Sequence, residues 1–146
     1  MIALDRLRAY RIAGKPRVRV LVVSMGLACC AMEVESAVRL GLLVADGEPG
    51  EPGDAADAGG STVLLVAGTV TDAMAPAVLA IARELPQGAR IVSFGACAGT
   101  GGPYWDAPTV MKGVDQLVPV ALYVPGCPPR PEALVTALAA LADGST

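Results

Sequence analysis

Four short runs of aliphatic and β-branched residues constrain the fold of this chain most strongly. They are residues 18–24, 62–67, 90–94 and 116–124. Runs that are apolar at nearly every position are typical of strands buried on both faces of a sheet. Three segments of helical composition alternate with these runs, at residues 31–43, 73–85 and 130–142. We therefore expect an α/β fold, a three-layer doubly wound parallel sheet of the flavodoxin-like type, with about four strands and flanking helices.

The domain organisation follows from length and composition. A chain of 146 residues is long enough to bury one core, and its 53 % hydrophobic content supplies that core. We expect a basic N-terminal arm at residues 1–17, either a short amphipathic helix or a solvated segment, followed by a single domain at residues 18–142. Residues 46–61 combine glycine, proline and alanine with five acidic residues and no basic one, so a mobile acidic loop is expected there.

Charge and hydropathy exclude several classes of function. The formal net charge of −3 argues against a nucleic acid as the partner. No apolar run is long enough for a membrane-spanning helix, and the N-terminal residues do not have the pattern of a secretory signal. A cytoplasmic protein, soluble or peripheral to a membrane, is the expectation.

The chain contains no histidine and four cysteines. The absence of histidine removes Ser-His-Asp and Cys-His catalysis and every zinc site with a histidine ligand. Each cysteine segment follows a predicted strand: Cys29 and Cys30 the first, Cys97 the third and Cys127 the fourth. Because the carboxyl ends of parallel strands meet at one edge of a sheet, we expect the four thiols to converge on one metal centre.

Soft thiolates select zinc, copper(I) or an iron–sulfur cluster. Structural zinc sites commonly use two Cys-x-x-Cys pairs, and this chain has none. Ligands spread over three loops suit an iron–sulfur cluster better, and the glycines around Cys97 permit the close approach that a cluster needs. Two disulfides are disfavoured because adjacent cysteines such as Cys29 and Cys30 pair poorly. Buried, inert cysteines remain the alternative.

Several motifs resemble those of one protein family. They are Gly26-Leu-Ala-Cys-Cys-Ala-Met-Glu33, Val66-Ala-Gly-Thr-Val-Thr71, Ser93-Phe-Gly-Ala-Cys-Ala98, Val114-Asp115, and Tyr123-Val-Pro-Gly-Cys-Pro-Pro129 with Pro131-Glu-Ala133. In this order, over roughly residues 18 to 140, they resemble the B subunit family, also called the 20 kDa subunit family, of NADH:quinone oxidoreductase (respiratory complex I). The adjacent cysteines distinguish this pattern from the Cys-x-x-Cys typical of nickel–iron hydrogenase small subunits.

The resemblance implies one [4Fe–4S] cluster, the terminal cluster of the complex, held by Cys29, Cys30, Cys97 and Cys127. It implies an electron-transfer subunit of a proton-translocating, membrane-associated NADH:quinone oxidoreductase, inactive alone, with no catalytic side chain of its own. The implied partners are the large, hydrogenase-like subunit of the 49 kDa type (the D subunit), other subunits of the peripheral arm, and a quinone bound at the interface. The implied location is the cytoplasmic side of the cell membrane, peripheral to it.

Two charged residues beside the cysteine motifs have functional and ordinary interpretations. Glu33 falls where the family has an acidic residue near the cluster, but a carboxylate near a helix N-terminus is also stabilised by the helix dipole. Arg130 could offset cluster charge or be a solvated surface residue.

The sequence departs from the family pattern between residues 37 and 62. Family members have Asp-x-x-Arg-Phe-Gly and then Ser-Pro-Arg-Gln-Ala-Asp here, whereas this chain has Arg39-Leu-Gly41 followed by the acidic loop. Since that segment helps to form the quinone pocket in the family, a divergent paralogue serving a variant complex is indicated. The alternatives are the small subunit of a complex I-like hydrogenase or ferredoxin-linked oxidoreductase, and a non-redox α/β binding module.

Overall fold

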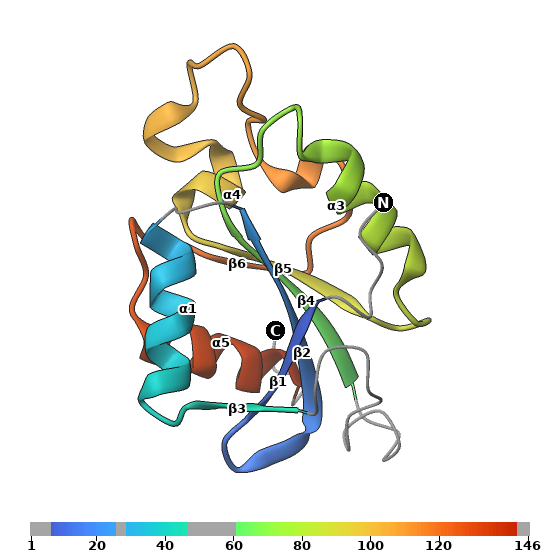
Figure 1. The fold of residues 1–146 in the computed structure, drawn as a ribbon, viewed down its shortest axis with the longest axis vertical. Coiled ribbons are helices and arrows are strands. Elements are labelled where there is room, and N and C mark those ends of the chain that lie inside the picture. Colours follow the sequence, from blue (N-terminus) through green and yellow to red (C-terminus); the bar gives the residue numbers. More distant parts are fainter. Residues whose placement is uncertain (1–6, 26–28, 47–60, 143–146) are drawn as a thin grey trace.

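In the part of the chain that the structure describes, the strands form a mixed six-stranded sheet with helices on both faces (Figure 1). The computed structural model describes residues 7–25, 29–46 and 61–142. The strands are β1 (Arg8–Ile12), β2 (Lys15–Met25), β3 (Leu43–Ala45), β4 (Ser61–Gly68), β5 (Arg90–Phe94) and β6 (Leu122–Val124). The helices are α1 (Cys29–Arg39), α3 (Ala75–Glu84), α4 (Ala96–Thr100) and α5 (Pro131–Ala142), with 3₁₀ turns η2 (Gly102–Tyr104) and η3 (Val114–Gln116).

The sheet has the strand order β3-β1-β2-β4-β5-β6. β2, β4, β5 and β6 are parallel neighbours, and β1 is antiparallel to both β2 and β3. The carboxyl ends of the four parallel strands therefore lie at the same edge of the sheet. The segments that follow β2, β5 and β6 are those that carry the cysteines.

Strand β4 shows why the sheet is covered on both faces. Its residues from Val63 to Ala67 are all at most 1 % exposed. Successive side chains point to opposite faces. Val63 and Leu65 accordingly join one apolar cluster, and Leu64 and Val66 join the other. An apolar run without alternation thus becomes the central strand of a three-layer structure.

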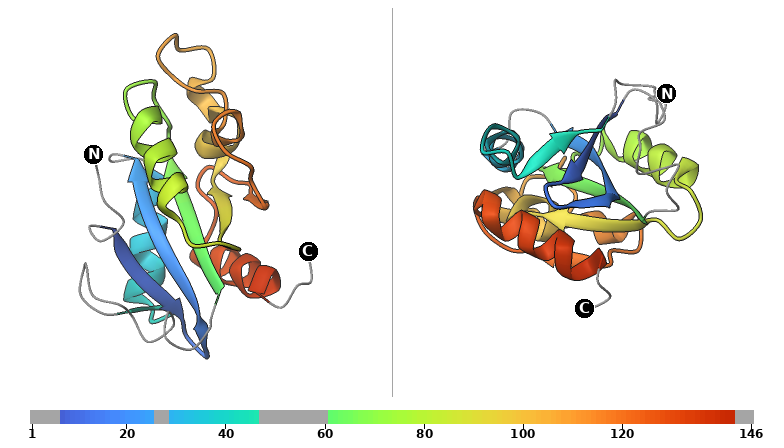
Figure 2. Two further views of the ribbon diagram at one scale, coloured as in Figure 1. Left: turned by 90° about the vertical axis from the view of Figure 1, so that its right-hand side faces the viewer. Right: turned by 90° about the horizontal axis from the view of Figure 1, so that it is seen from below.

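The two faces are covered by different helices, as the end-on view of Figure 2 shows. Helices α1 and α5 lie on one face, where Val34 and Leu138 are buried with the strand residues. Helix α3 lies on the other face and contributes Val78 and Ile81. Each such aliphatic side chain stabilises the fold by about 1.5–3 kcal/mol relative to exposure.

The predicted fold class is confirmed, but the sheet is larger than expected and not wholly parallel. Residues 8–12 form strand β1, not an amphipathic helix or a solvated arm, because Tyr10 and Ile12 point into the core with a period of two. The predicted helix over residues 31–43 ends at Arg39, and Leu43 begins the short strand β3. The last predicted strand, 116–124, is shortened to Leu122–Val124.

Most of the predicted acidic loop, residues 47–60, lies outside the described residues. Its first residue, Asp46, is 1 % exposed, and its backbone N–H donates a 3.0 Å hydrogen bond to the carbonyl of Ala9. The Asp46 carboxylate lies 3.5 Å from Nε of Arg19 in β2. Asp46 is therefore held in place by a backbone hydrogen bond and an ion pair.

None of the helices in the described part of the chain is both long and apolar enough to cross a membrane.

Candidate metal centre

Cys29 and Cys30 are the first two residues of α1, which follows β2 at the carboxyl edge of the sheet. Cys30 is completely buried and belongs to the apolar cluster beneath α1 and α5, whereas Cys29 is exposed. The free backbone N–H groups and the dipole of a helix N-terminus favour thiolates at such positions. The predicted place of the cysteine pair, at the start of a helix after the first parallel strand, is confirmed.

Cys97 lies in the short helix α4, three residues after the end of β5, and is 3 % exposed. The start of α4 is fastened to the end of β6 by two backbone hydrogen bonds. The N–H of Gly95 donates to the carbonyl of Val124, and the N–H of Ala96 donates to that of Gly126, each across 2.8 Å. These bonds hold the segment that carries Cys97 against the segment that leads to Cys127.

Cys127 lies in the turn between β6 and α5 and is exposed. Gly126 has φ 142°, and a Cβ atom on it would come within 2.8 Å of the backbone of Pro129. Pro131 begins α5, where a missing backbone N–H costs no helical hydrogen bond. The turn that presents Cys127 is thus tightly closed, as the prolines of the sequence predict.

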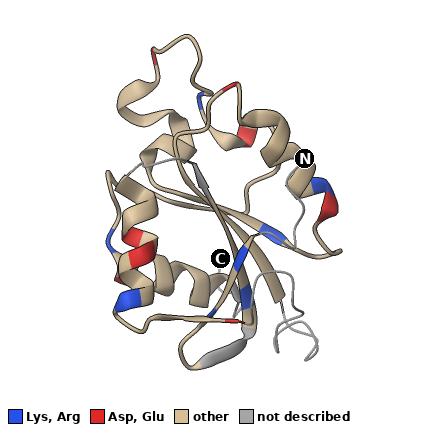
Figure 3. Ribbon diagram, in the orientation of Figure 1, with Lys and Arg blue, Asp and Glu red and all other residues tan. Residues whose placement is uncertain are grey.

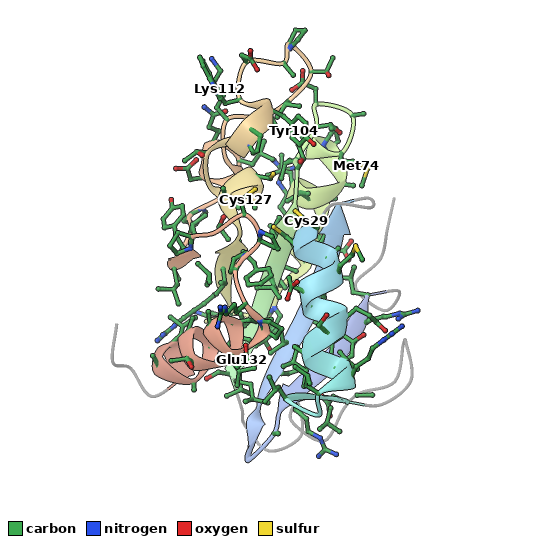
Figure 4. All side chains as sticks on the ribbon, turned by 90° about the vertical axis from the view of Figure 1, so that its left-hand side faces the viewer. Cys29, Met74, Tyr104, Lys112, Cys127 and Glu132 are labelled. Carbon is green, nitrogen blue, oxygen red and sulfur yellow. The ribbon has the colours of Figure 1, made fainter. Side chains whose placement is uncertain are left out.

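The structure brings the four cysteines together. Cys29 and Cys97 both lie near enough to Cys30 and Cys127 to influence the ionisation of these two thiols. Figure 4 shows Cys29 at the end of α1 beside Cys127, which arrives from the opposite side. Three separate segments therefore deliver their sulfurs to one region at the carboxyl edge.

The thiols disfavour one another's ionisation. Burial, and then the charges of Cys29, Cys97 and Cys127, raise the pKa of Cys30 to about 12. The pKa of Cys127 is raised by desolvation and by the charges of Cys29 and Cys97. Four thiolates at this place need a cation among them, and a metal centre that bound them would displace their protons.

Helix α4 has no charged residue, and the only charged residue of α5 is Glu132 (Figure 3). Neither helix therefore supplies that positive charge. Within the described residues, no hydrogen bond or ion pair joins Glu33 or Arg130 to a thiol. Arg130 is exposed, and Glu33 is half-buried on α1. No contact within the described residues assigns either residue a role at the thiols.

A single metal ion and an iron–sulfur cluster require different spacings of their thiolate ligands. Among residues 7–25, 29–46 and 61–142, no group of three or more His, Cys, Asp or Glu side chains is arranged to hold a metal ion. Around one ion, all the sulfurs lie at bonding distance from the same atom. In a [4Fe–4S] cluster each thiolate bonds a different iron, so the sulfurs lie farther apart.

One pair of residues near the thiols was not singled out as a site by sequence reasoning. The hydroxyl of Tyr123 in β6 is hydrogen-bonded to the carboxylate of Asp115 in η3. Both residues belong to the quoted family motifs, but nothing in the sequence indicates that they meet. Ser93, below α4, is fully buried, and its hydroxyl has no hydrogen-bond partner within the described structure.

Comparison with known proteins identifies similar sequences. The family model described as "NADH ubiquinone oxidoreductase, 20 Kd subunit" matches residues 28–141. The chain is 45 % identical over 129 residues to B subunit 2 of the NADH-quinone oxidoreductase of Streptomyces griseus, a match covering 84 % of this chain and 51 % of that protein. It is 46 % identical over 121 residues to B subunit 1 of the NADH-quinone oxidoreductase of Salinispora tropica, covering 78 % of this chain and 60 % of that protein. The chain thus spans only about half the length of these relatives.

Solved structures share the fold. A chain of the membrane-bound sulfane sulfur reductase, an archaeal respiratory membrane complex, is 32 % identical with a TM-score of 0.53, and the match covers 56 % of this chain and 46 % of that chain. A chain of the Ni-Fe-Se hydrogenase from Desulfomicrobium baculatum is 22 % identical with a TM-score of 0.57, and the match covers 86 % of this chain and 62 % of that chain. The hydrogenase match supports the flavodoxin-like arrangement of the sheet and helices alone.

Proposed function

Since the chain belongs to the 20 kDa subunit family of NADH ubiquinone oxidoreductase, we propose that it is an electron-transfer subunit holding one [4Fe–4S] cluster. The proposed ligands are Cys29, Cys30, Cys97 and Cys127. The complex it serves would be a membrane-associated, proton-translocating NADH:quinone oxidoreductase, with this subunit peripheral to the membrane on its cytoplasmic side. The chain would act as part of this complex and be inactive alone.

The observation that carries the proposal is the meeting of four thiols from three segments. Cys29 and Cys97 each lie close enough to Cys30 and Cys127 to disfavour their ionisation, and the four thiols come from the segments after β2, β5 and β6. Cysteine thiolates are the ligands that iron–sulfur clusters use, one for each iron of a [4Fe–4S] cube. When bound, such a cluster supplies one-electron transfer. The protein contributes the four bonds, their orientation and the surrounding dielectric.

The burial of the thiols divides the site into an inner and an outer side. Cys30 and Cys97 are both buried, and Cys30 shares an apolar cluster with the completely buried Phe94, so water is excluded from the inner side. Cys29 and Cys127 are exposed and form the outer side. A group held between them would be shielded by the core yet reachable from outside, which is the arrangement that electron exchange with a partner requires.

Exposed apolar side chains near this end of the sheet support a partner subunit. Met32, in the first turn of α1, is 67 % exposed, and Tyr104 and Trp105 after α4 are 57 % and 58 % exposed. Exposed apolar side chains can mark an interaction surface, and these lie beside two of the segments that carry the thiols. We assign this end to the large, hydrogenase-like subunit of the 49 kDa type, with quinone bound at the interface and the other peripheral-arm subunits supplying electrons.

A second candidate function is a role in a related respiratory complex that does not reduce quinone. It is favoured by the 32 % identity to a chain of the sulfane sulfur reductase complex and by the altered segment at residues 37–62. The neighbouring large subunit distinguishes the two. Four nickel-binding cysteines in that subunit would identify a hydrogenase-type complex, and their absence together with quinone reactivity would identify the oxidoreductase.

The test uses the full chain co-expressed with its large subunit and purified without oxygen. Reduction should produce the low-temperature EPR signal of a reduced [4Fe–4S] cluster, and added quinone should abolish it by reoxidation. Cys127→Ala should lose the signal, whereas Thr136→Ala, an exposed substitution on α5, should retain it. An unchanged signal in Cys127→Ala would remove Cys127 from the ligand set. A signal that persists after quinone addition would contradict the assigned acceptor.

A further inference from the structure

Gly95, between β5 and α4, lies directly against the sulfur of Cys30. Its φ of +93° is a backbone conformation that side chains rarely adopt. A Cβ atom on this residue would overlap Sγ of Cys30 and would lie 3.3 Å from Cys30 Cβ. Only a hydrogen atom fits between the two residues.

Neither backbone is free to move apart. The N–H of Gly95 donates to the carbonyl of Val124, and its own carbonyl accepts a 3.1 Å hydrogen bond from the N–H of Gly99. Cys30 is 0 % exposed and sits at the start of α1, packed in the core. Close-packed interiors give way little to added atoms, so an added methyl group would displace the mobile atom of the contact, the Cys30 sulfur.

We propose that Gly95 is a positioning residue whose missing side chain seats the Cys30 thiol toward Cys29, Cys97 and Cys127. The inference rests on the proposed function, because the seated thiol matters as a cluster ligand. A methyl group at position 95 turns the sulfur away from the other three and leaves a site with three usable thiols. Position 95 is therefore as necessary for the cluster as the cysteine it faces.

Gly88 provides a matched control. It has φ +86°, close to the value at Gly95, and a Cβ atom built on it meets nothing within 4 Å. Gly88→Ala therefore places a side chain at a positive φ without touching a thiol. Because Gly95 also has ψ 163°, a conformation that is nearly restricted to glycine, the Cys30→Ala background is needed to separate the contact with Cys30 from backbone strain.

The first experiment measures iron and acid-labile sulfide per chain, and the EPR spectrum after reduction, for the full chain purified without oxygen. The variants are Gly95→Ala, Gly88→Ala and Cys30→Ala. We expect Gly95→Ala to lose iron and signal to the level of Cys30→Ala, and Gly88→Ala to keep the iron content and spectrum of the parent. A Gly95→Ala chain with the parent's iron content and spectrum would overturn the inference, as would equal losses in both glycine variants.

A second experiment tests the steric contact without any metal, using the urea midpoint of the metal-free chain. In the parent background, Gly95→Ala should lower the midpoint more than Gly88→Ala does. In the Cys30→Ala background, which removes the overlapping sulfur and leaves the 3.3 Å contact with Cβ, the excess shift of Gly95→Ala over Gly88→Ala should become smaller. An excess shift that is the same in both backgrounds would overturn the inference.

The two experiments separate failure of this inference from failure of the proposed function. A parent chain that binds neither iron nor sulfide overturns the proposed function and the ligand role with it. A parent chain that holds the cluster, while Gly95→Ala holds it equally well, overturns the positioning role alone.

Discussion

The hydroxyl of Tyr123 in β6 donates a hydrogen bond to Oδ2 of Asp115 in η3 across 3.1 Å. Two residues before Asp115, Gly113 lies so close to the carbonyl oxygen of Gly99 in α4 that a side chain on Gly113 would overlap it. Helix α4, turn η3 and strand β6 are therefore tied together. Because α4 carries Cys97 and β6 leads to Cys127, this tie fixes two of the proposed ligand segments relative to each other.

The first prediction concerns the titration of Tyr123. Its pKa is raised above the ordinary 10.0, by desolvation first and then by the hydrogen bond and the charge of Asp115. Asp115→Asn should lower the pKa of Tyr123 toward the ordinary value. The change is measured as the tyrosinate absorbance during an alkaline titration, with Tyr123→Phe identifying the contribution of this residue.

The raised pKa of Tyr123 also makes the free energy of unfolding depend on pH. A group whose pKa is raised on folding contributes stability that is fully present below its unfolded pKa and is lost as pH rises through the folded value. The free energy of unfolding should therefore fall above pH 10, and Tyr123→Phe should remove part of that fall. Tyr104→Phe, which removes an exposed hydroxyl, is the control. An equal effect of the two substitutions would contradict the role given to the hydrogen bond.

The second prediction concerns the C-terminal end of α5. Nη1 of Arg90 in β5 donates a 2.8 Å hydrogen bond to the carbonyl of Leu141, which lacks a partner within the last helical turn. Arg90→Met should lower the free energy of unfolding by about 1 kcal/mol. Denaturant midpoints measure the change. Arg83→Met, an exposed substitution in the last turn of α3, should have a smaller effect, and equal effects would contradict the prediction.

The third prediction tests whether β1 belongs to the core. Ile12 is 3 % exposed and packs with the α1 and α5 layer. Ile12→Ala should lower the free energy of unfolding by about 2–5 kcal/mol, because the cavity adds to the lost burial. Arg8→Ala, an exposed substitution on the same strand, is the control. A cost for Ile12→Ala no larger than that of the control would mean that residues 8–12 are the solvated arm that composition suggested.

The fourth prediction concerns thiol reactivity in the metal-free chain. The thiolate is the reactive form, so a buried thiol with a raised pKa reacts slowly. Cys30, buried and with a pKa of about 12, should be alkylated last, and exposed Cys29 before it. Mass-spectrometric mapping after brief treatment with iodoacetamide gives the order. Rapid alkylation of Cys30 in the folded chain would contradict its placement in the core.

The strands could be predicted where burial on both faces left an unbroken apolar run. β5 begins and ends at the predicted residues, and β4 extends its prediction by one residue at each end. The cysteine segments were placed correctly for the same reason, because the edge at which they emerge follows from the parallel order of β2, β5 and β6.

The N-terminal strand was missed because two periodicities compete there. Leu4, Leu7 and Tyr10 have helical spacing, whereas Tyr10 and Ile12 alternate as in a strand, and pairing with β2 and β3 decides in favour of the strand. Gly14, with φ +79°, makes the turn into β2 and was the local signal of a hairpin. A three-residue strand such as β3 carries no sequence signal of its own.

Strand β6 is shorter than predicted because the apolar run includes Pro119. Proline cannot donate to a sheet, and pairing with β5 begins only where the N–H of Ala121 donates to the carbonyl of Ile91. Contacts between distant segments, such as Gly95 with Cys30 and Tyr123 with Asp115, also lie beyond sequence reasoning. They depend on how loops pack at the edge of the sheet and not on any local pattern.

The iron and acid-labile sulfide content of the full chain, purified without oxygen, decides whether the four thiols hold a [4Fe–4S] cluster. We predict about four irons and four sulfides per chain, and loss of this content when any one of the four cysteines is replaced by alanine. A chain that binds zinc in place of iron, or that keeps its iron and sulfide when Cys97 or Cys127 is replaced, would contradict it.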